Sequence, residues 1–401
     1  MKANRWLNGA IPAVGIHLSI GAVYAWSVFT NPVMEVMNAS LSQVSWVFSI
    51  AIFFLGMSAA FLGTIVENMG PRKSGLLCGL FYGTGLIGSG FAISLHSLPL
   101  LYLFYGVIGG IGLGIGYITP VKTLVNWFYD RPGLATGLAI MGFGFASAIA
   151  GPVISSLITS IGLVPTFYTI GAVYMAIIII CSRLIQPPSD DYLQAQNPDN
   201  IRDHRQQYTA NEAMKTGKFY ALWFLLFINI TCGIALLSVA SPLLQETVGV
   251  SALVAASIVG VMGIFNGGGR LVWATLSDYL GRDVVYTLFF VLEIIAMLIL
   301  GNVSNILLFQ LFLFIVMTCY GGGFSCIPAY LSDVFGTKHL SSIHGRILTA
   351  WAMAGIAGPC IISWAKATFS TYQDTLFIFA IFYGCALIVS AGLLYILRKD
   401  N

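Results

Sequence analysis

Charged residues are scarce in this chain. Asp, Glu, Lys and Arg make up 8% of its 401 residues, whereas 58% are hydrophobic. This balance excludes an ordinary water-soluble globular domain. The formal net charge is only +3, and we expect no nucleic-acid partner.

The sequence also lacks the patterns that hold cofactors. Its 7 cysteines lie in apolar runs and, like its 5 histidines, show no metal-ligand spacing. It contains no Gly-x-x-x-x-Gly-Lys phosphate loop, so ATP is not an expected energy source. No catalytic constellation is visible, and we expect no metal, no cofactor and no enzymatic activity. His17, which falls in an apolar run, is expected to be a hydrogen-bonded core residue.

Long hydrophobic runs recur along the whole chain. Each is about 20 residues long, enough for a helix to span a ~30 Å hydrocarbon core. The runs are continuous rather than alternating, which excludes a closed β-barrel. We therefore predict an all-α polytopic membrane protein with twelve transmembrane helices in two six-helix bundles. The helices are expected near residues 10–30, 44–66, 73–94, 99–121, 134–156, 164–184, 219–241, 251–273, 283–303, 305–329, 344–366 and 373–397.

The placement of basic residues predicts the orientation. Of the 18 Lys and Arg, all except Lys366 lie on the side of the chain termini or, in the case of Arg270, within the membrane. Positive charge marks the cytoplasmic side of a membrane protein. We therefore predict a multi-pass protein of the cell (cytoplasmic) membrane with both termini in the cytoplasm.

One long polar segment, residues 186–218, divides the chain. We predict an N-terminal six-helix bundle at 1–185, a flexible cytoplasmic linker at 186–218 with a short amphipathic piece near its end, and a C-terminal six-helix bundle at 219–401. Several landmarks recur in the same order in both halves. They are Pro120 and Pro328, Gly137 and Gly345, and the Ala-Gly-Pro triplets at 150–152 and 357–359. An internal duplication with the cargo site between the halves is typical of secondary transporters.

The loops after the second and eighth predicted helices share an acid-x-x-Gly-basic pattern. Together with twelve helices and a central loop, this pattern resembles the major facilitator superfamily. Within that superfamily the chain resembles the oxalate/formate antiporter family, a relative of the monocarboxylate transporters, along its whole length. The stretches that carry this resemblance are 23–29 (VYAWSVF), 212–216 (EAMKT), 238–242 (SVASP), 269–278 (GRLVWATLSD) and 333–338 (DVFGTK).

Arg270 is the leading candidate for binding. A charge at bilayer depth costs roughly 3 kcal/mol on insertion scales. Asp278, expected at the membrane surface, follows eight residues later, which places Arg270 ~12 Å deeper along the helix. A guanidinium is permanently charged and can hold a carboxylate through two hydrogen bonds. In the resembled family the arginine of this helix binds the substrate carboxylate. The alternative is a structural ion pair with Glu293. Without Arg270 as its partner, Glu293 would be a proton-carrying site, pair with another base, or be neutralised by protonation.

The resemblance implies further residues of the binding site. Tyrosines of the first and fourth helices line the pocket in that family, which points to Tyr24 and Tyr117. Tyr320 and Phe324, one turn apart, would form an aromatic gate. The alternative for all four is ordinary helix packing.

The eleventh predicted helix departs from the family pattern. Oxalate-handling relatives carry a lysine where this chain has Trp351. One cation matches one carboxylate, so we favour a monocarboxylate such as pyruvate, lactate or formate. Lys366, ~22 Å further along the helix, is too distant to replace the missing lysine.

The shared loop pattern predicts conformational rather than binding residues. These residues would pair with helix ends, hold one state of the carrier and separate in the other. They are Glu67, Gly70, Arg72, Asp278, Gly281 and Arg282.

These observations favour a secondary active transporter that moves a small organic anion by alternating access. The expected partners are the anion, the lipid bilayer, and protons or a counter-anion. Three alternatives remain open: a dicarboxylate (oxalate-type) antiporter, a transporter of an unrelated cargo class, and a sensor on the same fold.

Overall fold

A computed structural model describes residues 4–128, 132–189, 207–336 and 339–400. The described residues are almost entirely helical, with no β-strand among them. Two segments, η1 and η3, are π-helical and η2 is a 3₁₀-helix. The elements of the first half are η1 (Arg5–Ala10), α1 (Ile11–Ile20), η2 (Gly21–Ala25), α2 (Ser27–Met37), α3 (Leu41–Phe61), α4 (Gly63–Ser94), α5 (Leu98–Leu101), η3 (Tyr102–Gly109), α6 (Gly110–Trp127), α7 (Pro132–Ile161) and α8 (Leu163–Leu184).

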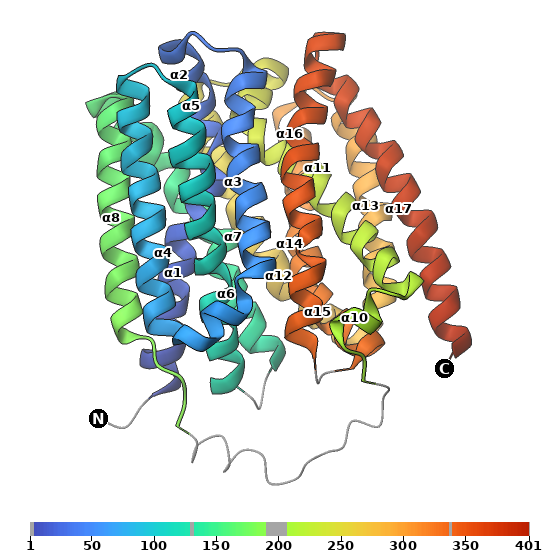
Figure 1. The fold of residues 1–401 in the computed structure, drawn as a ribbon. Coiled ribbons are helices and arrows are strands. Elements are labelled where there is room, and N and C mark those ends of the chain that lie inside the picture. Colours follow the sequence, from blue (N-terminus) through green and yellow to red (C-terminus); the bar gives the residue numbers. More distant parts are fainter. Residues whose placement is uncertain (1–3, 129–131, 190–206, 337–338, 401) are drawn as a thin grey trace.

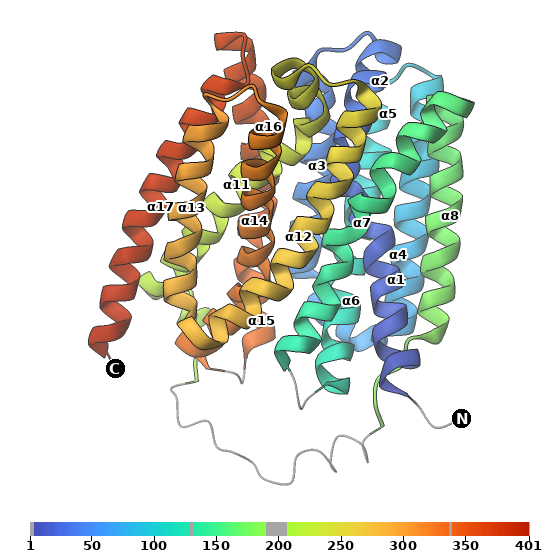
Figure 2. The ribbon, with the colours of Figure 1, turned by 180° about the vertical axis from the view of Figure 1, so that it is seen from behind.

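The described part of the linker contains α10 (Ala210–Ala213). The elements of the second half are α11 (Gly217–Val248), α12 (Ala252–Leu280), α13 (Arg282–Leu300), α14 (Ile306–Phe335), α15 (Leu340–Ile347), α16 (Thr349–Phe369) and α17 (Gln373–Asp400). The helices of the two halves form two neighbouring bundles, and both chain termini lie at the same end of the molecule (Figures 1 and 2).

The prediction of twelve membrane-spanning helices is confirmed within the described residues. Twelve helical stretches are long and apolar enough to cross a bilayer. Several extend beyond the ranges expected from hydrophobicity alone, because helices continue past the apolar core. The spans are Arg5–Ala25, Leu41–Phe61, Asn68–Ser94, Leu98–Val121, Ile140–Ile161, Leu163–Leu184, Gly217–Val248, Ala252–Leu280, Arg282–Leu300, Ile306–Phe335, Ser342–Phe369 and Gln373–Lys399.

At the end of the molecule that holds the termini, two of the expected loops are short breaks at a glycine. The loop predicted after the second span is a break inside α4, where Gly70 has φ 75° and ψ 165° and Pro71 follows. A positive φ is easily adopted only by glycine. Gly281, at the equivalent place in the second half, has φ 91° and joins α12 to α13. In the linker, α10 begins with a capping box formed by Thr209 and Glu212.

Small residues bring the two halves together. A Cβ atom on Gly144 of α7 would lie 2.7 Å from the Cα atom of Gly267 of α12. A Cβ atom on Gly56 of α3 would lie 2.5 Å from the backbone nitrogen of Ala352 of α16. Such close helix approach requires residues without bulky side chains. The two helix pairs α7–α12 and α3–α16 therefore form the seam on which the candidate site lies.

Candidate functional site

Arg270 lies at this seam, within α12, and its side chain is fully buried. Its Nε atom donates a hydrogen bond to Oδ1 of Asn266, one turn earlier, at 3.2 Å. Its Nη1 atom donates to the backbone oxygen of Ile140 of α7 at 3.1 Å. The guanidinium of the second half is thus tied to a backbone carbonyl of the first.

Aromatic rings cover the guanidinium from both halves. Its Cζ atom lies 5.2 Å from the ring centroid of Phe324 and 5.9 Å from that of Phe143. Cations are attracted to the faces of such rings, more strongly where water is excluded. The rings therefore stabilise the buried charge without neutralising it.

Two tyrosines join the halves beside Arg270. The hydroxyl of Tyr320, from α14, donates to the hydroxyl of Tyr24, from η2, at 2.7 Å. The ring of Tyr24 packs edge-on against Phe143 with a centroid distance of 4.8 Å. Tyr24 sits in a 3₁₀ segment between α1 and α2, so the first span is irregular at this level.

Trp351 of α16 completes the aromatic shell. Its ring lies 4.7 Å from Phe324, 5.0 Å from Tyr117 and 5.9 Å from Phe143, measured between centroids. Tyr117 comes from α6, so this contact also crosses between the halves. The shell combines elements of both bundles around one cation.

Several donors in this cluster are buried without a hydrogen-bond partner among the described residues. They are Nη2 of Arg270, the hydroxyl of Tyr117 and Nε1 of Trp351. Buried donors in folded proteins are nearly always paired, and an unpaired one costs roughly 1–3 kcal/mol. Three such donors within one aromatic cluster form a set that an anionic acceptor could satisfy.

The structure brings all six candidate binding residues into this cluster. They are Tyr24, Tyr117, Arg270, Tyr320, Phe324 and Trp351. Sequence reasoning missed Phe143, Asn266 and the backbone carbonyl of Ile140. Asn266 was detectable as the polar neighbour of Arg270 one turn earlier on the same helix face. Phe143 gave only a weak signal, an aromatic residue between two glycines.

His17 packs against two rings of the cluster, Tyr117 and Phe143. Its ring is buried, stacks on Tyr117 at 5.7 Å and places Nε2 3.0 Å from the backbone oxygen of Tyr117. The expectation of a hydrogen-bonded core histidine is confirmed. His17 therefore supports the position of the α6 backbone beside the shell.

Glu293 is buried but is not the partner of Arg270. Its Oε1 atom accepts a hydrogen bond from Nδ2 of Asn229 at 3.1 Å, and the same amide nitrogen lies 3.4 Å from the backbone oxygen of Cys319. Glu293 and Arg270 form no ion pair with each other within the described structure. The alternative of an Arg270–Glu293 ion pair is therefore wrong. Glu293 instead belongs to a separate polar cluster inside the second bundle.

The conformational candidates lie at the end of the molecule that holds the termini. Arg282 pairs with Asp278 and lies 3.4 Å from Oδ2 of Asp333 at the end of α14. In the first half, Nε of Arg72 donates to the backbone oxygen of Ile185 at 3.3 Å. The side chain of Glu67 lies outside the part that the structure describes.

Lys366 lies near the opposite end of α16, where it pairs with Glu246 and donates to the backbone oxygen of Ser370 at 3.0 Å. Among the described side chains, Arg270 is the only buried lysine or arginine. The described part of the site therefore holds one fixed positive charge.

Two bundles of membrane-spanning helices with a candidate cationic site at their seam are typical of secondary transporters. A family model described as the Major Facilitator Superfamily matches residues 13–359 and, in a second match, 222–401. The chain belongs to this superfamily of transporters.

Individual relatives narrow the comparison. The chain is 27% identical over 362 residues to the oxalate:formate antiporter of Oxalobacter formigenes, covering 89% of this chain and 84% of that protein. It is 25% identical over 407 residues to monocarboxylate transporter 12 of Mus musculus, covering 93% and 81%. A bacterial homologue of the human lysosomal transporter Spinster, in an inward-facing conformation, shares the fold with a TM-score of 0.73 at 14% identity, covering 96% of each chain.

Proposed function

We propose that this transporter moves a small monocarboxylate, of the pyruvate, lactate or formate type, by exchange across the membrane. The observation that carries the proposal is the buried Arg270, whose Nη2 atom has no hydrogen-bond partner among the described residues, inside a shell of aromatic rings. A carboxylate would accept from Nη2 and from the hydroxyl of Tyr117 or the indole of Trp351. The rings would pack on a small apolar body.

The number of charges favours one carboxylate over two. Arg270 is the only buried lysine or arginine among the described side chains, and the family resemblance implies that Trp351 stands where oxalate-handling relatives carry a lysine. A second carboxylate would face indole and phenyl rings, and burying an unpaired charge is costly. An oxalate-type cargo is therefore the weaker candidate.

The same charge count favours exchange over net movement. The hydrogen bonds that Arg270 donates go to a neutral amide and a neutral carbonyl, so the empty site keeps a positive charge. A bound monocarboxylate would cancel it. In the open states water can solvate this charge, and that water must leave when the empty site closes between the two orientations. If this desolvation adds to the barrier the roughly 3 kcal/mol that insertion scales give for a central arginine, reorientation of the empty carrier is slower by about 100-fold. The loaded carrier would then cross far more readily.

Contacts across the seam couple binding to movement. Arg270 bonds Ile140 and Tyr320 bonds Tyr24, and each pair joins one half to the other. A carboxylate competing for these donors would change the balance between the halves. We propose that segments 1–185 and 219–401 rock as two bundles joined by the linker 186–218, with the loop residues around Gly70 and Arg282 stabilising one state.

We further propose a cell-membrane location with both termini in the cytoplasm. The asymmetry of Lys and Arg supports this orientation. A protease-accessibility assay on intact cells that carry a terminal tag would test it. Cleavage of the tag from outside would contradict it.

The proposed function can be tested with purified protein in liposomes. Uptake of labelled pyruvate, lactate, formate and oxalate is measured with and without an internal carboxylate, and with and without a pH gradient. We expect at least one monocarboxylate to be taken up about 100-fold faster in the presence of internal substrate, with little response to the gradient. Uptake driven mainly by a proton gradient would favour symport instead.

Other outcomes separate the remaining alternatives. Preferred uptake of oxalate would favour the dicarboxylate antiporter. Movement of neutral or cationic solutes alone would identify an unrelated cargo class. Carboxylate binding without uptake would indicate a sensor.

A further inference from the structure

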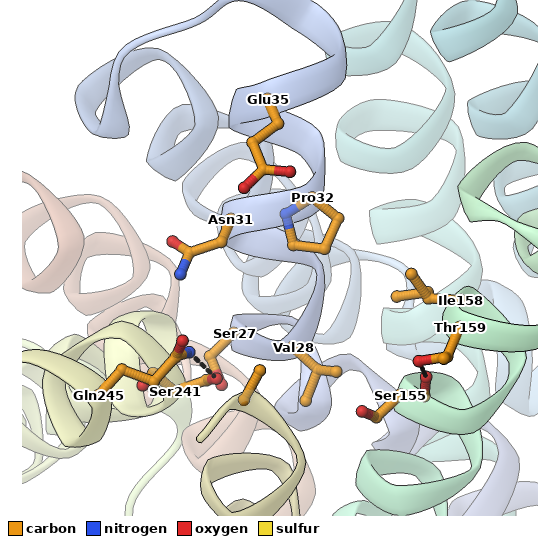
Figure 3. Close-up of a pocket in the computed structure, with 11 residues that line it drawn as sticks. Ser27, Val28, Asn31, Pro32, Glu35, Ser155, Ile158, Thr159, Ser241 and Gln245 are labelled. Carbon is orange, nitrogen blue, oxygen red and sulfur yellow. Dashed lines mark hydrogen bonds between the residues drawn. The ribbon is translucent and has the colours of Figure 1, made fainter. Parts of the chain in front are cut away.

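A polar cavity separate from the Arg270 cluster lies between the two halves, toward the end of the molecule opposite the termini. It has a volume of about 210 Å³ and is lined by residues of α2, α7, α11 and α12. Figure 3 shows Asn31 and Glu35 projecting from α2, with Ser241 and Gln245 of α11 on the facing side. The candidate site at Arg270 does not use these residues.

The first span contributes to both the cavity and the Arg270 cluster. Ser27 lines the cavity and is the first residue of α2. It follows Tyr24 of η2 by three positions. On the facing side, α11 leaves helical geometry at Val239, just before Ser241 and Pro242. The cavity therefore lies where both helices are irregular.

Hydrogen-bonding groups line this cavity from both halves. Ser27 is 1% exposed, and its Oγ atom has no hydrogen-bond partner among the described residues. The side-chain nitrogen of Gln245 donates to Oγ of Ser241 at 3.0 Å. With the amide of Asn31, these groups can solvate a carboxylate whose water is being removed.

One charge is present among the lining residues, and it is negative. Glu35 is exposed at this cavity, and no lysine or arginine lines it. A fixed carboxylate repels each negative charge of an entering solute, so a dianion is penalised twice as much as a monoanion. The same geometry that admits a carboxylate thus selects against a second one.

We propose that this cavity is an entry site for cargo on the side away from the termini, and that Glu35 sets its preference for monoanions. The proposal rests on the proposed function. Selection would then occur in two stages: Glu35 disfavours a second charge at entry, and Arg270 offers only one cation at the centre.

The test compares the two faces of the transporter. Intact cells expose the cavity, and inside-out vesicles from the same cells expose the face that holds the termini. In each preparation, labelled pyruvate uptake is measured with increasing pyruvate and with oxalate as inhibitor. The variants are Glu35→Gln and, as a matched control, Asp374→Asn, which removes an acid at the start of α17 on the same side.

At the cavity face, Glu35→Gln should lower the half-saturating pyruvate concentration about fivefold. It should lower the inhibitory oxalate concentration about 25-fold, because oxalate carries two charges. Values at the opposite face and in Asp374→Asn should stay unchanged. Gln245→Glu, which adds an acid from the other half, should shift both values in the opposite direction.

Equal changes at both faces, or none at the cavity face, would overturn the role of Glu35 while leaving carboxylate exchange intact. If the wild-type protein moves neither pyruvate nor any other carboxylate, the proposed function itself fails. The two failures are therefore distinguishable.

Discussion

Replacing Trp351 with lysine should convert the site from one that matches a single carboxylate to one that matches two. Trp351 and the guanidinium of Arg270 contact the same ring, Phe324, at 4.7 and 5.2 Å. A lysine at this place would lie within about 10 Å of Arg270. At an effective dielectric constant near 20, a second carboxylate about 4 Å from the new ammonium gains about 4 kcal/mol.

The empty and singly occupied states lose stability in the variant. Two cations about 8 Å apart repel by about 2 kcal/mol at the same dielectric constant. Only a dianion relieves this repulsion fully. The preference for oxalate over pyruvate should therefore rise by about 1,000-fold, which corresponds to the 4 kcal/mol gained by the second carboxylate.

Competition assays in liposomes measure this preference directly, as the ratio of oxalate to pyruvate concentrations that halve uptake. Trp351→Met is the control for lost ring packing, and Trp364→Lys places the same charge on an exposed part of α16. Neither control should change the ratio. A folded, active Trp351→Lys protein that keeps its preference for pyruvate would refute the charge-matching argument.

Two further predictions concern packing and protonation. Gly144→Val should slow transport at least about fivefold, because its Cβ atom would lie 2.7 Å from the Gly267 backbone and overpacking costs about 1–3 kcal/mol. Gly384→Val, with open space around it, is the matched control, and equal rates in the two variants would contradict the close packing at the seam. Glu293→Gln should leave the transport rate and the pH dependence of transport unchanged, since an amide oxygen can still accept a hydrogen bond from Asn229. Loss of the pH dependence in this variant would instead assign Glu293 a role in carrying protons.

The number of helices could be predicted because hydrophobic length alone decides it. Each apolar run must span the bilayer, and the twelve runs match twelve helices. A connection around Gly70 was expected between two apolar runs, but its form was not, because a glycine at positive φ inside a helical stretch leaves no hydrophobic signal. The expected loop there is instead a sharp kink.

Within the binding cluster, the residue with the most unusual chemistry for a membrane helix could be predicted from the sequence. Arg270 stands out as a rare charge, and the resemblance of its surroundings supplied the aromatic residues. Phe143 and the Ile140 carbonyl escaped, because phenylalanine is common in membrane helices and a backbone atom has no identity in sequence. That Arg270 and Glu293 do not pair could be seen only in the structure. A similar height along two helices does not determine whether the side chains lie on the facing sides of those helices.

Direct binding to Arg270 is the most decisive test of a carboxylate site at the seam. Purified protein is titrated with the carboxylate that the liposome assays select, and tryptophan fluorescence or calorimetry reports the dissociation constant. Arg270→Lys keeps the charge but loses the planar pair of donors, so the constant should rise at least about tenfold for one lost charge-assisted hydrogen bond. Arg270→Gln loses the charge as well and should bind at least about 100-fold more weakly. Unchanged affinity in both folded variants would contradict the account.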